Sequence, residues 1–256
     1  MSAQPAEISV GGTDEFLAVV SEQTTGGHVW HAARHLLSYF HAHPHLLSRA
    51  STLIELGAGT GFLGMSLAVK FDVGQVVLTE MPQGGALEWL AHNVERNRRV
   101  GHDLSTVRTA AFDWAWIDHD AKASSASAVC DAATQEFDRL CSTTWDFVLG
   151  SDLVYNESGV HMLPRVLATL AQESTKVLYA HTLNRFEFLD RDFFEALASV
   201  GLQCRSVWPE DGEEVNFGSA AVDYAVAHAM NEQDGFSGEL FPEQRVVVLE
   251  ISRRQA

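Results

Sequence analysis

Apolar and polar positions alternate along the chain in blocks that predict strands followed by helices. Short apolar runs predict buried strands over residues 52–56, 75–80, 106–112, 145–152, 176–181, 202–208 and 245–251. Apolar residues at helical spacing predict helices over residues 62–70, 86–97, about 158–172 and 191–201. Because strands and helices alternate, the pattern predicts an α/β fold with a doubly wound, mainly parallel sheet and helices on both faces.

Three segments depart from this alternation. Residues 1–27 form a polar, Gly-containing N-terminal arm, and residues 118–144 are rich in Ala, Ser and Asp with weak periodicity. We interpret residues 118–144 as an insertion that is partly disordered or loosely helical, and residues 219–242 as a second insertion. The chain is therefore expected to be an arm (1–27) followed by a single domain (28–256).

Two further predictions concern individual helices. The stretch "HVWHAARHLLSYF" places Trp30, Ala33, Leu37 and Phe40 near one face of an amphipathic helix. Pro164 either kinks the helix predicted around residues 158–172 or lies in its first turn.

Composition indicates a globular protein of one domain with a large core. The chain has 256 residues, of which 46% are hydrophobic and 20% charged. It has no run of about 20 apolar residues, as a membrane helix needs, and its N-terminus does not resemble a secretory signal. Three widely spaced cysteines, Cys130, Cys141 and Cys204, fit a reducing compartment. We expect the cytoplasm, with the nucleus as the alternative.

The charge balance limits the class of partner. Lys and Arg number 17 and Asp and Glu number 34, which gives a net charge of −17. A field of that sign disfavours nucleic acid and anionic membranes and attracts a basic partner, such as a lysine-bearing protein surface. The alternative is that the charge only aids solubility. Nothing in the sequence demands more than a monomer.

The stretch "LIELGAGTGFLGMS" at residues 53–66 predicts a strand, a tight glycine turn and the start of a helix. Such a turn brings backbone N–H groups close to a ligand. Gly57, Gly59 and Gly61 follow G-x-G-x-G, whereas a dinucleotide turn follows G-x-G-x-x-G and a phosphate loop adds Lys-Ser/Thr. A pyrophosphate is therefore disfavoured, and a smaller zwitterion such as the methionine end of S-adenosylmethionine could pack there.

Glu80 supports a nucleoside cofactor. It ends the next predicted strand, 19 residues after Gly61, where a carboxylate can accept hydrogen bonds from both hydroxyls of a ribose. The glycine turn and this acid together favour a cofactor site over a purely structural turn.

Four stretches together resemble a known family: "LIELGAGTGFLG", "FDW" at 112–114, "VLGSDLVY" at 148–155 and "GHVWHAARHLLSYF" at 27–40. They are similar to the METTL21-like group, or methyltransferase family 16, of S-adenosylmethionine-dependent methyltransferases. The resemblance spans about residues 27–205 without the 118–144 segment. It implies the Rossmann-like class I methyltransferase fold, with seven strands and an antiparallel last strand. Characterised members are mostly protein-lysine methyltransferases, and a related branch methylates protein histidine.

The resemblance also implies roles for individual residues. Glu55 and the three glycines would line the methionine end of the cofactor, and Glu80 would hold its ribose. Asp113 and Trp114 would contact the adenine, Trp30 would close the pocket, and Ser151 would also contact the cofactor. Asp152 and Tyr155 match a D-x-x-Y motif next to the transferred methyl group.

The expected chemistry is methyl transfer to a protein lysine, whose ammonium must first lose a proton. Asp152 would attract the ammonium and then orient the neutral amine, with Tyr155 lining the lysine channel or donating to the cofactor carboxylate. Alternatives are a small-molecule N-methyltransferase, a protein-histidine methyltransferase and a non-catalytic cofactor-binding module.

Several of these residues also have plain structural interpretations. Asp152 could simply cap the following helix, and Trp30, Trp114 and Trp116 could be core or edge aromatics. His31 and His35 could share a helix face as metal ligands, but that face also carries Ser38 and looks solvated. We therefore expect no metal.

Overall fold

The fold comes from a computed structural model. It describes residues 7–9, 17–19, 29–118, 128–183, 189–208, 216–217 and 246–254. Within these residues, no helix has the length and apolar character that crossing a membrane would require.

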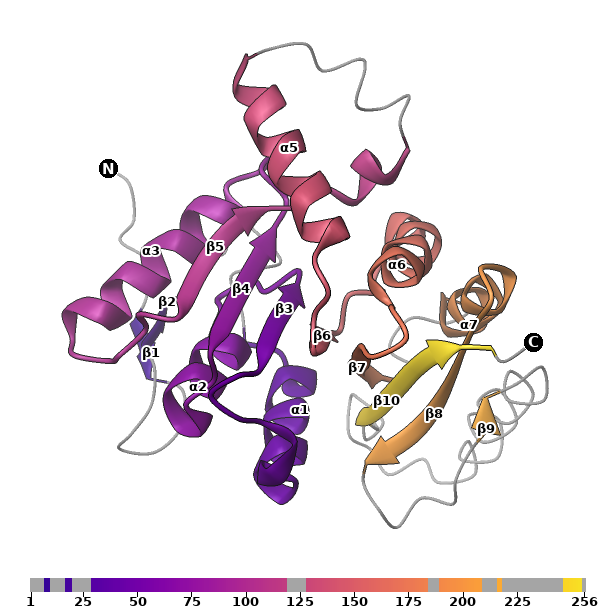
Figure 1. Cartoon of the computed structure of the whole chain (residues 1–256), viewed down its shortest axis with the longest axis horizontal. Coiled ribbons are helices and arrows are strands. Elements are labelled where there is room, and N and C mark those ends of the chain that lie inside the picture. Colours follow the sequence, from indigo (N-terminus) through magenta and orange to yellow (C-terminus); the bar gives the residue numbers. More distant parts are fainter. Residues whose placement is uncertain are drawn as a thin grey trace, which may run out of the picture.

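One large mixed sheet organises the molecule (Figure 1). Its strands are β3 (Thr52–Leu56), β4 (Gln75–Glu80), β5 (Val107–Ala111), β6 (Phe147–Ser151), β7 (Lys176–Thr182), β8 (Leu202–Trp208), β9 (Asn216–Phe217) and β10 (Val246–Arg253). They lie in the order β5-β4-β3-β6-β7-β10-β8-β9. Strands β5 to β7 of this order run parallel, and β10 runs antiparallel to both β7 and β8. The predicted mainly parallel, seven-stranded sheet with an antiparallel last strand is confirmed, and the two-residue β9 extends it at the edge.

The chain reverses its direction of travel across the sheet between β3 and β6. From β3 it moves outward through β4 to β5 and then returns to the other side of β3 to form β6. In a doubly wound sheet such a reversal leaves a crevice beyond the carboxyl ends of the strands, where ligands bind.

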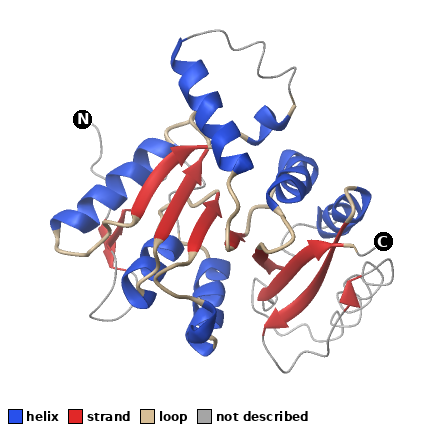
Figure 2. Cartoon of the chain, in the orientation of Figure 1, coloured by secondary structure: helices blue, strands red, loops and turns tan. Residues whose placement is uncertain are grey.

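Helices cover both faces of the sheet, as Figure 2 shows. They are α1 (His31–Ala42), α2 (Phe62–Phe71), α3 (Ala86–Arg99), α5 (Ala128–Ser142), α6 (Glu157–Leu170) and α7 (Leu189–Ser199), with 3₁₀ turns η2 (Pro44–Leu46) and η3 (Trp114–Ile117). One core cluster joins α1, α2 and α3 to one face, and a second joins α5, α6 and α7 to the other. Strand side chains alternate between the clusters: Leu53 lies in the first and Ile54 in the second.

The segment predicted as an insertion at 118–144 contains a helix of the core. In α5, Phe137 and Leu140 are buried, and the Phe137 ring lies 4.5 Å from the Phe112 ring, centroid to centroid. Arg108 of β5 forms an ion pair with Glu136 of this helix. The helical part of that interpretation therefore applies to residues 128–142, which pack against the sheet.

Other boundaries also differ from the sequence predictions. Helix α1 begins after Trp30, whose backbone is extended (φ −76°, ψ 152°), so Trp30 does not belong to the buried helix face as predicted. Pro164 lies in the interior of α6 and not in its first turn. Within the predicted arm, β1 (Glu7–Ser9) and β2 (Leu17–Val19) pair antiparallel beside α3 (Figure 1). The predicted insertion at 219–242 lies outside the described residues.

Candidate active site

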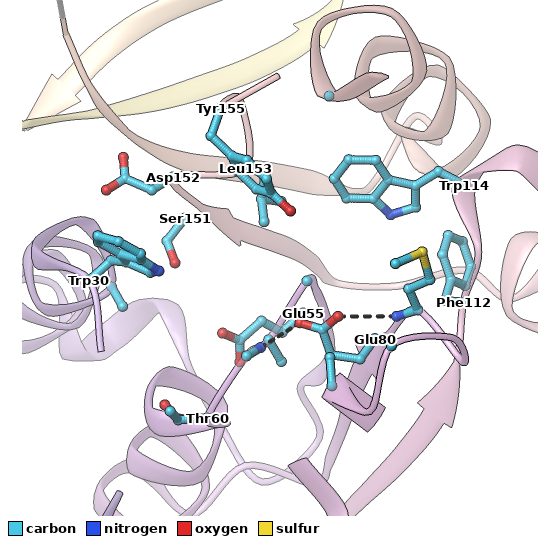
Figure 3. A pocket seen from close by; sticks show the side chains of 18 of the residues that line it. Trp30, Glu55, Thr60, Glu80, Phe112, Trp114, Ser151, Asp152, Leu153 and Tyr155 are labelled. Carbon is cyan, nitrogen blue, oxygen red and sulfur yellow. Dashed lines mark hydrogen bonds between the residues drawn. The ribbon is translucent and has the colours of Figure 1, made fainter. Parts of the chain in front are cut away.

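A cavity of about 620 Å³ lies at the carboxyl ends of β3, β4 and β6. Every site residue predicted from the sequence lines it except Gly61. In Figure 3, Phe112 and Trp114 stand at one end of the cavity and Trp30, Ser151 and Asp152 at the other, with Glu80 between them. The reversal of strand order therefore brings together residues from positions 30 to 155 of the chain.

The glycine turn connects β3 to α2 through left-handed backbone conformations. Gly57, Gly59 and Gly61 have φ angles of 54°, 57° and 78°, which glycine adopts without steric cost. A Cβ on Gly57 would lie 2.5 Å from Leu153 Cδ2, so this glycine also makes room for the loop after β6. Gly61 precedes the first residue of α2, and a Cβ there would lie 2.8 Å from Leu90 Cδ1. Gly61 thus allows the turn to form and lets Leu90 of α3 pack closely against it.

Glu55 joins the cavity to the first turn of α2. Its side chain is buried, and Oε2 accepts a hydrogen bond of 2.8 Å from the Gly64 N–H, one of the N–H groups that a helix start leaves without a partner within the helix. Burial raises the pKa of Glu55 to about 8; the Gly64 N–H opposes this rise and the nearby Glu80 charge adds to it. Glu55 is therefore a mostly neutral acid at pH 7 that a cationic ligand would favour in its ionised form.

Glu80 is the last residue of β4 and is held by backbone donors on both oxygens. Oε1 accepts from the Gly59 N–H at 2.8 Å, and Oε2 accepts from the Met81 N–H at 3.1 Å. Burial raises the pKa of Glu80, while the Gly59 and Met81 hydrogen bonds lower it. Each carboxylate oxygen can accept a further bond, so the pair can serve a ligand diol while it stays fixed to the glycine turn.

The end of the cavity away from Trp30 and Asp152 has a wall of aromatic side chains. Phe112 follows β5, and Trp114 begins η3. Asp113 lies between them, and its Oδ1 accepts a hydrogen bond of 2.9 Å from the Ala115 N–H, which caps η3. The predicted acceptor for an adenine amino group therefore has one oxygen engaged in this cap, and the residue lines the cavity together with Phe112 and Trp114.

Asp152 begins the loop after β6 in a left-handed conformation, with φ 50°. Its carboxylate accepts two hydrogen bonds from Thr182 at the end of β7, from N–H to Oδ1 and from Oγ1 to Oδ2, both of 2.9 Å. The alternative that Asp152 caps the next helix is excluded, because Asn156 occupies the cap of α6 and accepts from the Gly159 N–H. Asp152 is held by the neighbouring strand and lines the cavity.

Large exposed apolar side chains line the cavity as well. Trp30 is 36% exposed and Tyr155 is 43% exposed, and Met81 is also exposed. These three make up most of the exposed large hydrophobic side chains among the described residues. Trp30 is thus neither a core anchor nor part of the buried face of α1.

Several residues around the site were not predicted from the sequence. Thr182 orients Asp152, Leu153 fills the space over Gly57, and Met81, Phe112 and Thr60 line the cavity. Phe112 belongs to the "FDW" motif, so the sequence could have identified it as a site residue. Thr182 carries no local signal, since only the β6–β7 pairing brings it to Asp152.

The residues present fit a nucleoside cofactor that carries positive charge. The cavity combines a carboxylate at a strand end, a glycine turn without side chains, two buried acids and an aromatic wall. Burial raises the pKa of Glu55, so the ionised form of this acid gains from a nearby cation. No group of three or more His, Cys, Asp or Glu side chains suitable for a metal occurs in the described part of the chain.

Comparison with known proteins adds an independent line of evidence. The model of the lysine methyltransferase family matches residues 17–200. EEF1A lysine methyltransferase 3 from Mus musculus is 32% identical over 142 residues, 56% of this chain and 48% of that protein. Protein N-lysine methyltransferase METTL21A from Xenopus tropicalis is 30% identical over 169 residues, 66% of this chain and 65% of that protein.

A fungal protein completes the comparison. Protein N-terminal and lysine N-methyltransferase EFM7 from Yarrowia lipolytica is 25% identical over 194 residues, 70% of this chain and 65% of that protein. The chain thus spans about half the length of the mouse relative and just under two thirds of the other two. Since the family match covers most of the chain and includes the glycine turn, Glu80 and the Asp152 loop, the chain belongs to the lysine methyltransferase family.

Proposed function

We propose that this protein is an S-adenosylmethionine-dependent protein-lysine N-methyltransferase. The observation that carries the proposal is a single cavity lined both by Glu80 with the glycine turn and by Asp152 with Tyr155. The first pair suits a nucleoside cofactor and the second suits an acceptor amine. Family membership supports the reaction class, and the names of the three relatives include lysine methyltransferase.

The residues that would hold the cofactor divide by position in the cavity. Glu80 would accept from the ribose hydroxyls, Phe112 and Trp114 would cover the adenine, and Glu55 with Gly57 and Gly59 would surround the methionine end. When bound, S-adenosylmethionine supplies a methyl group activated by a sulfonium. The raised pKa of Glu55 means that ionisation of this acid would accompany the arrival of positive charge.

Asp152 would act on the acceptor. A lysine ammonium has an ordinary pKa of about 10.4 and must lose a proton before its nitrogen can form a bond. The Asp152 carboxylate, oriented by Thr182, would attract the ammonium and then accept a hydrogen bond from the neutral amine. Tyr155 and Trp30 would enclose the alkyl chain and remove water from the charged head, which lowers the pKa of the amine.

The substrate is proposed to be a basic protein surface. The net charge of −17 would draw such a surface toward the protein over long distances. The exposed rings of Trp30 and Tyr155 then offer apolar contact to the stem of an inserted lysine.

Label transfer tests the proposal. Purified protein is incubated with methyl-labelled S-adenosylmethionine and a lysate from cells that lack the gene, and the products are separated on a gel. Wild type should label a discrete protein band whose label maps to lysine, and Asp152→Asn should reduce labelling by about a hundredfold, as loss of a positioned acid or base does.

A matched control exists at the other end of the sheet. Asp146 also accepts from the N–H and Oγ1 of a threonine, Thr52, but lies at the amino ends of the strands. Asp146→Asn should therefore label as wild type does. Label in the low-molecular-weight fraction alone would show a small-molecule methyltransferase, label on histidine would show a histidine enzyme, and no label despite cofactor binding would show a binding module.

A further inference from the structure

We propose that Tyr179 is a positioning residue for the Asp152 loop and acts through its hydroxyl group. The inference rests on the proposed function, because it concerns how the loop that carries Asp152 and Tyr155 is kept in its working shape. Tyr179 lies on β7, does not line the cavity and is 1% exposed.

The hydroxyl of Tyr179 binds the loop backbone directly. Its oxygen accepts hydrogen bonds from the N–H groups of Leu153 and Val154, at 2.9 Å and 3.2 Å. These are the two residues that follow Asp152, and both side chains are buried. A buried N–H without an acceptor is costly, so one tyrosine oxygen stabilises two consecutive peptide groups that lie outside any helix or strand.

The loop needs such support because Asp152 is in the left-handed region, with φ 50°. A residue other than glycine stays in that region when its surroundings fix it. Strand β7 fixes it twice: Thr182 holds the carboxylate of Asp152, and Tyr179 holds the chain just after it. Without the second support, the carboxylate remains bound but the direction in which the chain leaves Asp152 toward Tyr155 is no longer set.

The sequence makes room for this arrangement at Gly150. Gly150 of β6 pairs with Tyr179 of β7, and a Cβ on Gly150 would lie 3.2 Å from Tyr179 Cδ2 and 2.9 Å from Leu153 Cδ1. The missing side chain therefore lets both the Tyr179 ring and the Leu153 side chain approach β6. Burial, and then the nearby Asp152 charge, raise the pKa of Tyr179, so the hydroxyl keeps its proton while its oxygen accepts from the two N–H groups.

The test compares two variants that each remove one buried tyrosine hydroxyl. Tyr179→Phe removes the acceptor of the two loop N–H groups, and Tyr39→Phe removes a hydroxyl group from α1, away from the cavity. For Tyr179→Phe we expect kcat to fall about ten- to a hundredfold, as small misplacements of reacting groups do. The Kd for S-adenosylmethionine should stay within about threefold, because Glu80 and the glycine turn are unchanged, whereas the KM for the protein acceptor should rise as Tyr155 loses its fixed position. Tyr39→Phe should match wild type in all three.

Amide hydrogen exchange gives a second measurement that does not depend on activity. In the wild type, the N–H groups of Leu153 and Val154 should exchange slowly, and in Tyr179→Phe they should exchange at least tenfold faster while the amides of β3 and β4 stay protected. Rapid exchange at both positions in the wild type overturns the proposal, as does wild-type kcat in a folded Tyr179→Phe. A wild type that transfers no methyl group refutes the proposed function, while exchange still decides whether Tyr179 holds the loop.

Discussion

Glu55, Glu80 and Asp152 bring three carboxyl groups to one cavity, and each is held by different donors. Glu55 accepts from a helix start, Glu80 from two backbone N–H groups of the turns around it, and Asp152 from Thr182 of the neighbouring strand. A carboxyl fixed by the fold does not have to be ordered when a ligand arrives. The fold therefore fixes all three carboxyl groups before any ligand binds, although the donors that hold them differ.

Glu55 should make the stability of the protein depend on pH. Its pKa is about 8 in the folded chain against 4.5 for an ordinary Glu, so between these values the folded state retains a proton that the unfolded state has released. The free energy of unfolding should therefore fall as pH rises through this window, by up to about 1.4 kcal/mol per pH unit. Urea unfolding at several pH values should show this slope in wild type and a smaller one in Glu55→Gln, and equal slopes would contradict it.

Glu80 should decide cofactor affinity. Glu80→Ala removes the proposed acceptor for the ribose hydroxyls and the acceptor of the Gly59 N–H, so the Kd for S-adenosylmethionine should rise by at least about a hundredfold. Isothermal titration calorimetry measures this change. Glu88→Ala, an exposed acid on α3, serves as the control and should leave the Kd unchanged. A Kd for Glu80→Ala close to that of wild type would show that the carboxylate does not bind the cofactor.

At the scale of elements, the hydrophobic pattern located strands β3 to β8 and β10 and helices α2, α3, α6 and α7 to within two residues. Strands β3, β4 and β8 have the predicted bounds. The pattern was less informative over α5, which lies in a stretch rich in Ala, Ser and Asp, because short side chains give little periodic signal. It also could not separate Trp30 from α1, since one extended residue before a helix fits the same spacing.

The site shows the same division between local and long-range information. The glycine turn and Glu80 follow local rules of strand ends and turns, so their places in the cavity could be predicted. Thr182 and Tyr179 act through the pairing of β6 with β7, and no window of sequence contains both partners. A tyrosine in the middle of a buried strand is the one available signal, because its hydroxyl needs a partner.

Helix α5 should behave as part of the core. Phe137 packs against Phe112 and Trp116, so Phe137→Ala should lower the free energy of unfolding by about 3–5 kcal/mol. Gln135→Ala, at an exposed position of the same helix, should change it by less than about 0.5 kcal/mol. Denaturant unfolding of both variants provides the measurement. If Phe137→Ala left the free energy of unfolding unchanged, α5 would not be part of the core.

At the scale of the whole molecule, the topology of the sheet determines where the cavity lies. The net charge, in contrast, acts on molecules that have not yet reached the cavity. The reversal between β3 and β6 opens the crevice, whereas the net charge of −17 extends to distant solutes. The position of the crevice and the net charge are independent properties, because net charge influences association with other molecules and not the fold.

Salt should therefore weaken the encounter with a basic protein acceptor. Raising ionic strength from about 0.05 M to about 0.5 M shortens the screening length, so kcat/KM should fall by about tenfold. Because saturation removes the encounter step, kcat should change little. Steady-state kinetics over a salt series measures both, and a flat kcat/KM would show that the charge serves solubility alone.

The position of β10 has a consequence for synthesis on the ribosome. This strand follows all others of the sheet along the chain, yet it inserts between β7 and β8 and pairs Val246 with Thr182. While the nascent chain has emerged only as far as β8, one edge of β7 still has no neighbour. The threonine that orients Asp152 thus lies on a strand that is paired along one edge only, to β6, until translation has passed β10. We therefore expect the part of the cavity built on β3 and β4 to form first, and the part built on the Asp152 loop to reach its final form only after β10 has paired with β7.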